Sequence, residues 1–314
     1  MTEPLGDVDE LDEDLDVFEQ SPEEASQSVS TLRDLPQATL LSVEDADAFL
    51  RWRPASIVAI IGERNGGKTT LISEIYAQFL KGKFADYMFS HSLSLMGFEK
   101  KIFQSRSESG LEVPDTQRTS AQEGLSFFHL QIADLLTNSS KHDLLISERA
   151  GETYKDIRDK PELASSLLEI TKSEIIVLII DGERVCDARE RAEVFASIRN
   201  IARALVQSEY IQEKSRIQLV TTKFDLLQGD NSPKALEALV NFEETIRKIF
   251  DNKHLISTHR VAARDPKRLM DPAHGVAELL RSWLQPKVVA VGCSLKLPTL
   301  VSEFDKLALR RTSY

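Results

Sequence analysis

The sequence has few of the features on which disulfide-stabilised, membrane and metal proteins depend. Only two cysteines occur in 314 residues, Cys186 and Cys293, which excludes a disulfide framework and indicates reduced thiols. The longest apolar run, residues 175–180, is far too short to cross a bilayer, and no signal peptide is recognisable. The six histidines show no spacing typical of a metal site. We therefore expect a cytoplasmic protein.

Basic residues are in the minority, and the formal net charge is −11. This balance argues against a general affinity for DNA, RNA or anionic lipid, so we expect neither a nucleic acid nor a membrane as partner. Residues 6–24 contain many Asp and Glu and no Lys or Arg. Residues 1–42 are accordingly predicted to be an acidic disordered tail. In the alternative interpretation, Leu11, Leu15 and Phe18 form a short helix on a partner protein.

Hydrophobic patterns predict a folded domain at residues 43–285 and a C-terminal extension at residues 286–314. Ser42 and Asp45 mark a helix start, and Pro54 requires that helix to end by Arg53. An insertion is expected at about residues 81–115, with a short strand and a helix of its own. Strands are predicted at residues 57–61, 87–90, 125–132, 143–147, 174–180, 217–220 and 255–257, and helices from residue 68 and at residues 97–105, 187–206, 232–250 and 276–284.

Residues 62–69 read GERNGGKT and match G-x-x-x-x-G-K-[ST] at every fixed position. A predicted strand precedes them and a helical pattern follows, which is the context of a phosphate-binding loop. Glycines let backbone N–H groups surround phosphate oxygens at the positive end of a helix. Lys68 would reach the β- and γ-phosphates and Thr69 would bind Mg²⁺. The residues expected to hold a nucleoside triphosphate here are Gly62, Glu63, Arg64, Asn65, Gly66, Gly67, Lys68, Thr69 and Thr70.

A polar stretch just before the strand at residues 125–132 is the next candidate. A phosphate-loop GTPase places there a hydroxyl that completes Mg²⁺ coordination when the γ-phosphate is present. Thr119 is the favoured residue, with Thr116 and Ser120 as alternatives.

The strand at residues 143–147 ends in E-R-A-G-E, where GTPases carry D-x-x-G. Glu148 takes the place of the Asp that holds a Mg²⁺-bound water, and the Gly151 N–H would meet the γ-phosphate. Glu152 stands where many small GTPases have the Gln that orients water. A carboxylate there would be repelled by the γ-phosphate, so slow intrinsic hydrolysis is expected. Arg118 is the first candidate for a charge-stabilising arginine, followed by Arg64 and Arg149.

Thr222-Lys223-Phe224-Asp225 directly follows another predicted strand and matches [NT]-K-x-D. The Asp225 carboxylate can accept from both N1–H and N2–H₂ of guanine, which adenine cannot offer. The stem of Lys223 would cover the base, and a backbone contact to O6 is expected near Ala262 and Ala263.

Taken in this order, the motifs make the chain resemble a P-loop GTPase of the translation-factor-related class. Two further stretches resemble the bacterial double-GTPase-like domains: FSHSL with GFE at residues 89–99, and PDT with RTS at residues 114–120. The resemblance implies a Ras-like α/β fold: a mostly parallel sheet with one antiparallel strand and helices on both faces. It also implies GTP/GDP and Mg²⁺ as ligands and a regulatory role with partner proteins in a bacterial anti-phage system. The sequence leaves open whether the chain forms a nucleotide-dependent dimer.

Two other functions compete with this interpretation. In a P-loop ATPase, Asp181 would be the Mg²⁺-binding acid and Glu183 the base, which leaves Lys223 and Asp225 without a role. The other alternative is an adaptor that binds GTP without cleaving it, which Glu152 favours.

Overall fold

In the computed structural model the chain divides into two units, Met1–Gln37 and Ala38–Tyr314. The structure describes residues 39–103, 124–135, 140–160, 163, 166–208, 211–228, 232–250, 253–265 and 269–285, which all belong to the second unit. The expected tail at residues 1–42 lies almost entirely outside the described residues, and the extension at residues 286–314 lies wholly outside them. The predicted domain boundaries therefore stay predictions.

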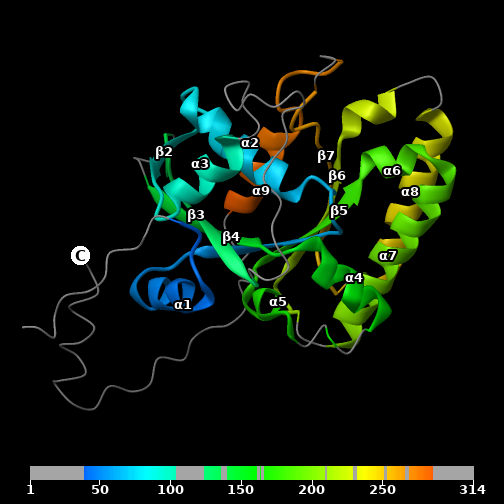
Figure 1. Ribbon diagram of the computed structural model, residues 1–314, viewed down its shortest axis with the longest axis horizontal. Coiled ribbons are helices and arrows are strands. Elements are labelled where there is room, and N and C mark those ends of the chain that lie inside the picture. The colour runs from blue at the N-terminus through cyan, green and yellow to red at the C-terminus, as the bar shows by residue number, and fades with distance from the viewer. Residues whose placement is uncertain are drawn as a thin grey trace, which may run out of the picture. The chain divides into compact units, whose positions relative to one another are not determined.

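A seven-stranded sheet in the order β2-β3-β4-β1-β5-β6-β7 forms the centre of the second unit (Figure 1). In the described sheet, β3 runs antiparallel to both of its neighbours, and every other pairing is parallel. The expected fold class, a mostly parallel α/β sheet with one antiparallel strand, is confirmed. The strands are β1 Ser56–Ile61, β2 Tyr87–His91, β3 Ser126–Asp134, β4 Lys141–Glu148, β5 Ile175–Asp181, β6 Arg216–Thr222 and β7 Ile256–Arg260.

Helices cover both faces of this sheet (Figure 1). One apolar cluster joins the strands to α2, α3 and α9, and a second joins them to α4, α5, α7 and α8. The helices are α1 Val43–Trp52, α2 Lys68–Leu80, α3 Leu95–Phe103, α4 Gly151–Asp159, α5 Leu168–Lys172, α6 Gly182–Cys186, α7 Ala188–Gln207, α8 Ser232–Ile249 and α9 Val276–Leu284, with a 3₁₀ helix η5 at Phe224–Gln228.

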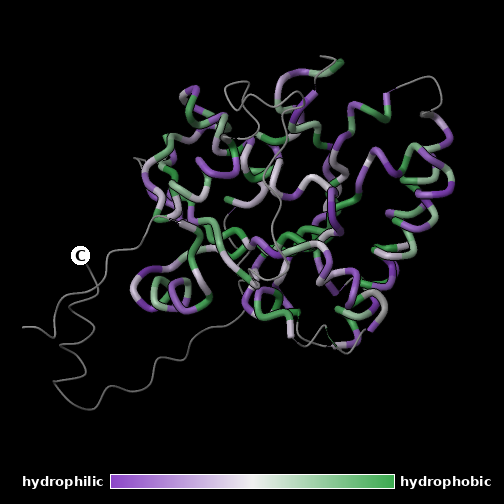
Figure 2. Tube along the Cα trace, viewed as in Figure 1, coloured by the Kyte–Doolittle hydropathy of each residue, from purple (hydrophilic) through white to green (hydrophobic). Residues whose placement is uncertain are grey.

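The two clusters explain why the central strands lack polar alternation. In β1, Val58 and Ile60 belong to the first cluster, whereas Ala59 and Ile61 belong to the second. A strand covered on both faces needs apolar residues at every position. Figure 2 shows hydrophobic residues concentrated along the strands at the centre of the domain.

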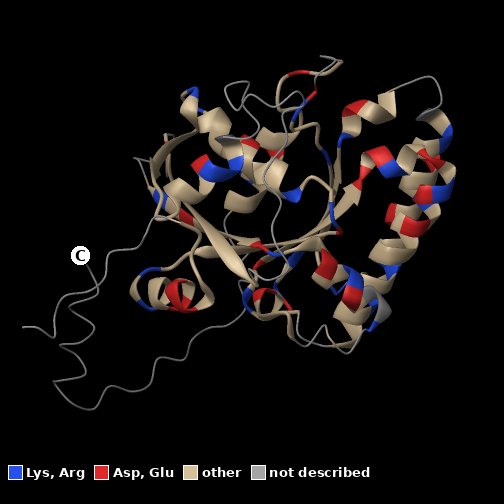
Figure 3. Ribbon diagram, viewed as in Figure 1, with Lys and Arg blue, Asp and Glu red and all other residues tan. Residues whose placement is uncertain are grey.

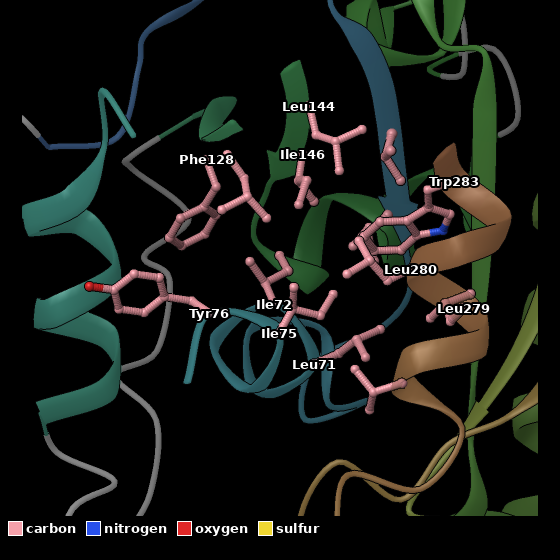
Figure 4. Close-up of a cluster of buried hydrophobic side chains, with 14 of the residues drawn as sticks. Leu71, Ile72, Ile75, Tyr76, Phe128, Leu144, Ile146, Leu279, Leu280 and Trp283 are labelled. Atoms are coloured by element: carbon pink, nitrogen blue, oxygen red, sulfur yellow. The ribbon is translucent and has the colours of Figure 1, made fainter. Parts of the chain in front are cut away.

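Helix α2, which follows the glycine-rich loop, is anchored in the first cluster. Leu71, Ile72 and Ile75 are almost completely buried, and their side chains meet Ile146 of β4 and Leu280 of α9 in the same cluster (Figure 4). Burial of such side chains contributes roughly 1.5–3 kcal/mol each. The loop is thus held between a fixed strand and a fixed helix.

Helix α1 begins and ends as the sequence predicts. Ser42 and Asp45 form a capping box, in which the Asp45 N–H donates to Ser42 Oγ over 3.1 Å and the Ser42 N–H donates to Asp45 Oδ2 over 3.0 Å. Arg53 closes the helix in an extended conformation before Pro54. The described part of the expected insertion, residues 81–103, contains the edge strand β2 and helix α3. Among the helices that the structure describes, none combines the length and apolar character needed to span a bilayer.

The short helices α4, α5 and α6 and the 3₁₀ helix η5 were not predicted. Helices α5 and α6 have five residues each, too few to show a period, and α4 has only Tyr154 and Ile157 as fully buried apolar positions. Helices α4 and α6 and the 3₁₀ helix η5 directly follow strands β4, β5 and β6, whereas α5 directly precedes β5.

A buried polar network crosses β3 and β4. The Leu93 N–H donates to Nδ1 of His129 over 2.9 Å, so the proton of the neutral ring is on Nε2, which lies 3.0 Å from Asp143 Oδ1. Asp143 also accepts from Gln131 at 2.9 Å and pairs with Arg53 at 2.8 Å. Burial lowers the pKa of His129 below its ordinary value.

This pKa shift predicts a loss of stability in mild acid. Because the folded pKa of His129 lies below the unfolded value of about 6.5, the unfolded chain binds more protons in this range. The free energy of unfolding should therefore fall as the pH falls through 6.5.

In His129→Gln the decline between about pH 7.5 and 5.5 should be smaller, as measured by urea denaturation. Part of it should remain, since burial also lowers the pKa of His259. An equal decline in His129→Gln and in the wild type would contradict the prediction.

Candidate functional site

Five loops that carry the sequence motifs meet at one edge of the sheet. Strands β4, β1, β5, β6 and β7 are parallel neighbours, so their carboxyl ends lie at the same edge. Ligands of open α/β sheets bind outside these strand ends. The residues expected to bind phosphate, metal and base are therefore brought to one edge, except those that lie outside the described residues.

The glycine-rich loop after β1 contacts the ammonium of its own lysine through backbone carbonyl groups. Gly67 and Asn65 have φ values of +84° and +60°, which glycine and asparagine adopt more readily than other residues. The Lys68 ammonium donates to the carbonyl oxygens of Gly62 at 2.7 Å and Glu63 at 2.9 Å. Burial lowers the pKa of this ammonium to about 8. A phosphate would supply the counter-charge that such a group favours, so the loop fits an anionic ligand.

The Thr69 hydroxyl donates to Oε1 of Glu148 over 2.8 Å. Glu148 is only 1% exposed and ends β4 beside β1. The Ile60 N–H of β1 donates to Ser147 Oγ over 2.9 Å, which holds the end of β4 against β1. A hydroxyl and a carboxylate in contact beside a phosphate loop fit a magnesium site, because Mg²⁺ prefers oxygen ligands and uses few from the protein.

Gly151 lies directly against the phosphate loop. A Cβ placed on it would come within 2.2 Å of the Arg64 nitrogen and 2.5 Å of the Glu63 carbonyl carbon. On the neighbouring residue, the carboxylate of Glu152 lies 3.4 Å from Nη1 of Arg64. The expected water-orienting position and the phosphate loop are therefore joined by an exposed ion pair.

Arg149 faces the protein interior. Its guanidinium donates twice to Glu169, at 2.8 and 2.9 Å, and Tyr154 Oη donates to the same carboxylate and to the Ile60 carbonyl, both at 3.2 Å. The Glu169 side chain is fully buried. Arg149 is thus committed to a structural ion pair, whereas Arg64, another arginine proposed for charge stabilisation, remains at the exposed mouth of the site.

The T-K-x-D residues are fixed to the phosphate loop and to β5. Thr222 Oγ1 donates to the carbonyl of Gly66 over 2.8 Å. Lys223 Nζ lies 3.0 Å from Asp181 Oδ2 and 2.7 Å from Glu183 Oε2. Asp225 follows in η5 and is only 3% exposed.

The loop after β7 is tied to η5. The Phe224 N–H donates to the Val261 carbonyl over 3.1 Å. The Ala262 N–H donates to the His274 carbonyl, also over 3.1 Å. Ala262 and Ala263 are the two residues expected to contact guanine O6. The N–H of Ala262 is already used in this backbone hydrogen bond, so Ala263, the next residue, is the other candidate.

Two predicted site residues, Thr119 and Arg118, lie outside the described residues, as do the alternatives Thr116 and Ser120. Sequence reasoning missed Arg184 and Ser197, which both bind the side chain of Glu63. Neither residue stands in a motif, so no local pattern could have identified them.

The close approach of Gly151 to the Arg64 backbone allows a test of how the loop after β4 packs against the phosphate loop. Gly151→Ala would push a methyl group into the backbone at Arg64, and overpacking of this kind costs about 1–3 kcal/mol of unfolding free energy. The measurement is urea denaturation. The control is Gly124→Asn, because Gly124 has φ +67° and nothing within 4 Å of an added Cβ. An unchanged unfolding midpoint in Gly151→Ala would show that the loops separate easily.

One comparison with known proteins agrees with this geometry. The family model described as Double-GTPase 2 matches residues 56–284, which span the sheet from β1 to α9. No curated protein matches the sequence significantly. The match covers most of the chain and includes the phosphate loop, the E-R-A-G-E stretch and the T-K-x-D motif. The chain therefore belongs to the Double-GTPase 2 family, whose description indicates a GTP-binding domain of the GTPase type.

Proposed function

We propose that this protein is a GTP-binding switch that hydrolyses GTP slowly and acts on partner proteins. The observation that carries the proposal is the contact between Thr69 and Glu148, at 2.8 Å, beside the buried ammonium of Lys68. A cation and a hydroxyl at the start of α2, with a carboxylate from the end of β4 in contact with the hydroxyl, are what a magnesium–triphosphate ligand requires. Backbone N–H groups of the loop would receive the phosphate oxygens.

Thr69 and Glu148 are the residues that would hold Mg²⁺, with Thr119 as the third from the segment outside the described residues. When bound, Mg²⁺ would neutralise phosphate charge and orient the β- and γ-phosphates. Glu148 is one methylene longer than the usual aspartate, and its contact with Thr69 supports the view that this length suits the site. Gly151 would offer its N–H to the γ-phosphate.

The ATPase alternative is disfavoured by the partners of Asp181. Its carboxylate pairs with Lys223, which also pairs with Glu183, so both acids of that alternative are engaged by one ammonium. Thr69, in contrast, donates to Glu148. The acid in contact with the phosphate-loop hydroxyl is therefore our choice for the metal.

Guanine recognition is assigned to Asp225, with the Lys223 stem over the base and Thr222 holding the loop in place. A carboxylate excluded from water pairs strongly with two N–H donors. We assign the contact to guanine O6 to the N–H of Ala263, because that of Ala262 is used by His274.

The Arg64–Glu152 pair is the group that we propose to set the rate of hydrolysis. The Glu152 carboxylate would repel an attacking oxygen and the γ-phosphate, whereas Arg64 offsets part of its charge. Arg118 remains our candidate for stabilising transition-state charge.

The regulatory role rests on the double-GTPase family. We propose that GTP and GDP states differ in the loops that contain Thr119 and Gly151, and that partner proteins or a second copy of the chain recognise the difference. A bacterial anti-phage system in the cytoplasm is the proposed setting.

Base recognition is tested by Asp225→Asn. GTP affinity should fall at least about a hundredfold, since two charge-assisted hydrogen bonds at roughly 1.5 kcal/mol or more each are lost. Xanthosine triphosphate carries a carbonyl in place of the 2-amino group of guanine, and the amide that Asp225→Asn introduces can donate a hydrogen bond to this carbonyl. The variant should therefore bind xanthosine triphosphate more tightly than it binds GTP. Calorimetric titration with GTP, ATP and xanthosine triphosphate measures these affinities.

The matched control is Glu237→Gln on the exposed face of α8, which removes the same charge and should leave GTP affinity unchanged. Wild-type preference for ATP over GTP would reject guanine recognition. So would an unchanged GTP affinity in Asp225→Asn.

The hydrolysis proposal is tested by Glu152→Gln. Removing the negative charge and supplying an amide should raise single-turnover phosphate release by about tenfold, equivalent to 1.4 kcal/mol of barrier. Glu152→Ala relieves the repulsion without orienting water and should give a smaller increase. Equal or slower release from Glu152→Gln would contradict the proposed role, and no release from any variant would favour the adaptor.

A further inference from the structure

Glu63 places a carboxylate inside the phosphate loop, next to the proposed anion site. Such a group would repel a triphosphate unless it is neutralised or turned away. Its Oε2 lies 2.8 Å from Nη1 of Arg184, and its Oε1 accepts a hydrogen bond from the hydroxyl of Ser197. We call Arg184 and Ser197 the Glu63 clamp.

The clamp is built on elements outside the loop. Ser197 is fully buried on α7, and Arg184 lies on the short helix α6 that follows β5. Arg184 is itself held by Glu190 at 3.4 Å and Glu193 at 3.3 Å. Acidic and basic residues are interspersed along this part of α7 (Figure 3). The guanidinium is therefore held in place before any ligand arrives.

The backbone of Glu63 takes part in the same arrangement. Its carbonyl oxygen accepts from Nζ of Lys68 at 2.9 Å and from the N–H of Gly66 at 3.4 Å. Anchoring the side chain of Glu63 toward α7 therefore also positions the carbonyl that orients the phosphate-binding lysine.

We propose that Arg184 and Ser197 are positioning residues that hold the Glu63 carboxylate away from the phosphates and so permit the binding of a nucleoside triphosphate. The proposal rests on the proposed nucleotide-binding function and adds a charge-screening role that no motif assigns. Without the clamp, the carboxylate would lose the two contacts that direct it toward α7, and any turn toward the loop would oppose the ligand's charge. The loss should be larger for GTP than for GDP, because the triphosphate carries more negative charge.

The experiment is a fluorescence titration of the full chain with methylanthraniloyl-GTP and methylanthraniloyl-GDP in the presence of Mg²⁺. Arg184→Ala should weaken GTP binding about tenfold or more, the effect of one charged interaction. The double variant Glu63→Gln, Arg184→Ala should bind GTP nearly as well as Glu63→Gln alone, because no carboxylate then needs holding. Arg189→Ala, an exposed arginine on α7, is the control with the same change of charge and should bind as the wild type does.

A purely structural role for Arg184 would not be rescued by Glu63→Gln, so equal weakness of the single and double variants overturns the proposal. Wild-type affinity in Arg184→Ala overturns it as well. Should Arg184→Ala fail to fold, Ser197→Ala takes its place: weaker binding restored by Glu63→Gln supports the clamp, and unchanged binding rejects it. A wild-type chain that binds no guanine nucleotide rejects the proposed function itself, which separates that failure from a failure of the clamp.

Discussion

The buried ammonium of Lys68 is the constraint on which the site depends. Burial lowers its pKa to about 8, and the carboxylates of Glu148, Glu152 and Glu63 act in the opposite direction. Each of these three acids contacts a neighbouring donor: the first accepts from Thr69, the second pairs with Arg64 and the third with Arg184. The three carboxylates therefore favour the charged form of the lysine while each also contacts another side chain, which suits a loop that must receive an anion.

The parallel sheet brings these partners together. Residues 62–67 follow β1, while Glu148 ends β4 on one side and Asp181 ends β5 on the other. Parallel strands require long crossovers, so neighbouring strand ends come from distant parts of the sequence. The packing of α2 against α9 and of α7 against the opposite face keeps the strand ends in register. Close approaches such as that of Gly151 to Arg64 follow from this packing.

Local sequence was sufficient to predict the features that depend on interactions between neighbouring residues. The capping box at Ser42, the N-cap at Asp187 and the glycine-rich turn each depend on residues within a few positions of one another. The central strands were also predictable, because burial on both faces demands continuous apolar runs. The helices α4 to α6 were not, since five to nine residues hold too few apolar positions to reveal a period.

The sequence by itself determined the class of fold, the order of the motifs and the side chains suited to phosphate and guanine. Only the tertiary structure decided which acid meets Thr69, that Arg149 is committed to Glu169, and that Glu63 is held by Arg184 and Ser197. The separation along the chain explains the difference: Glu63 and Ser197 are 134 residues apart. A motif records chemistry within a few residues, whereas the pairing of distant charges depends on how the sheet and its helices bring strand ends together.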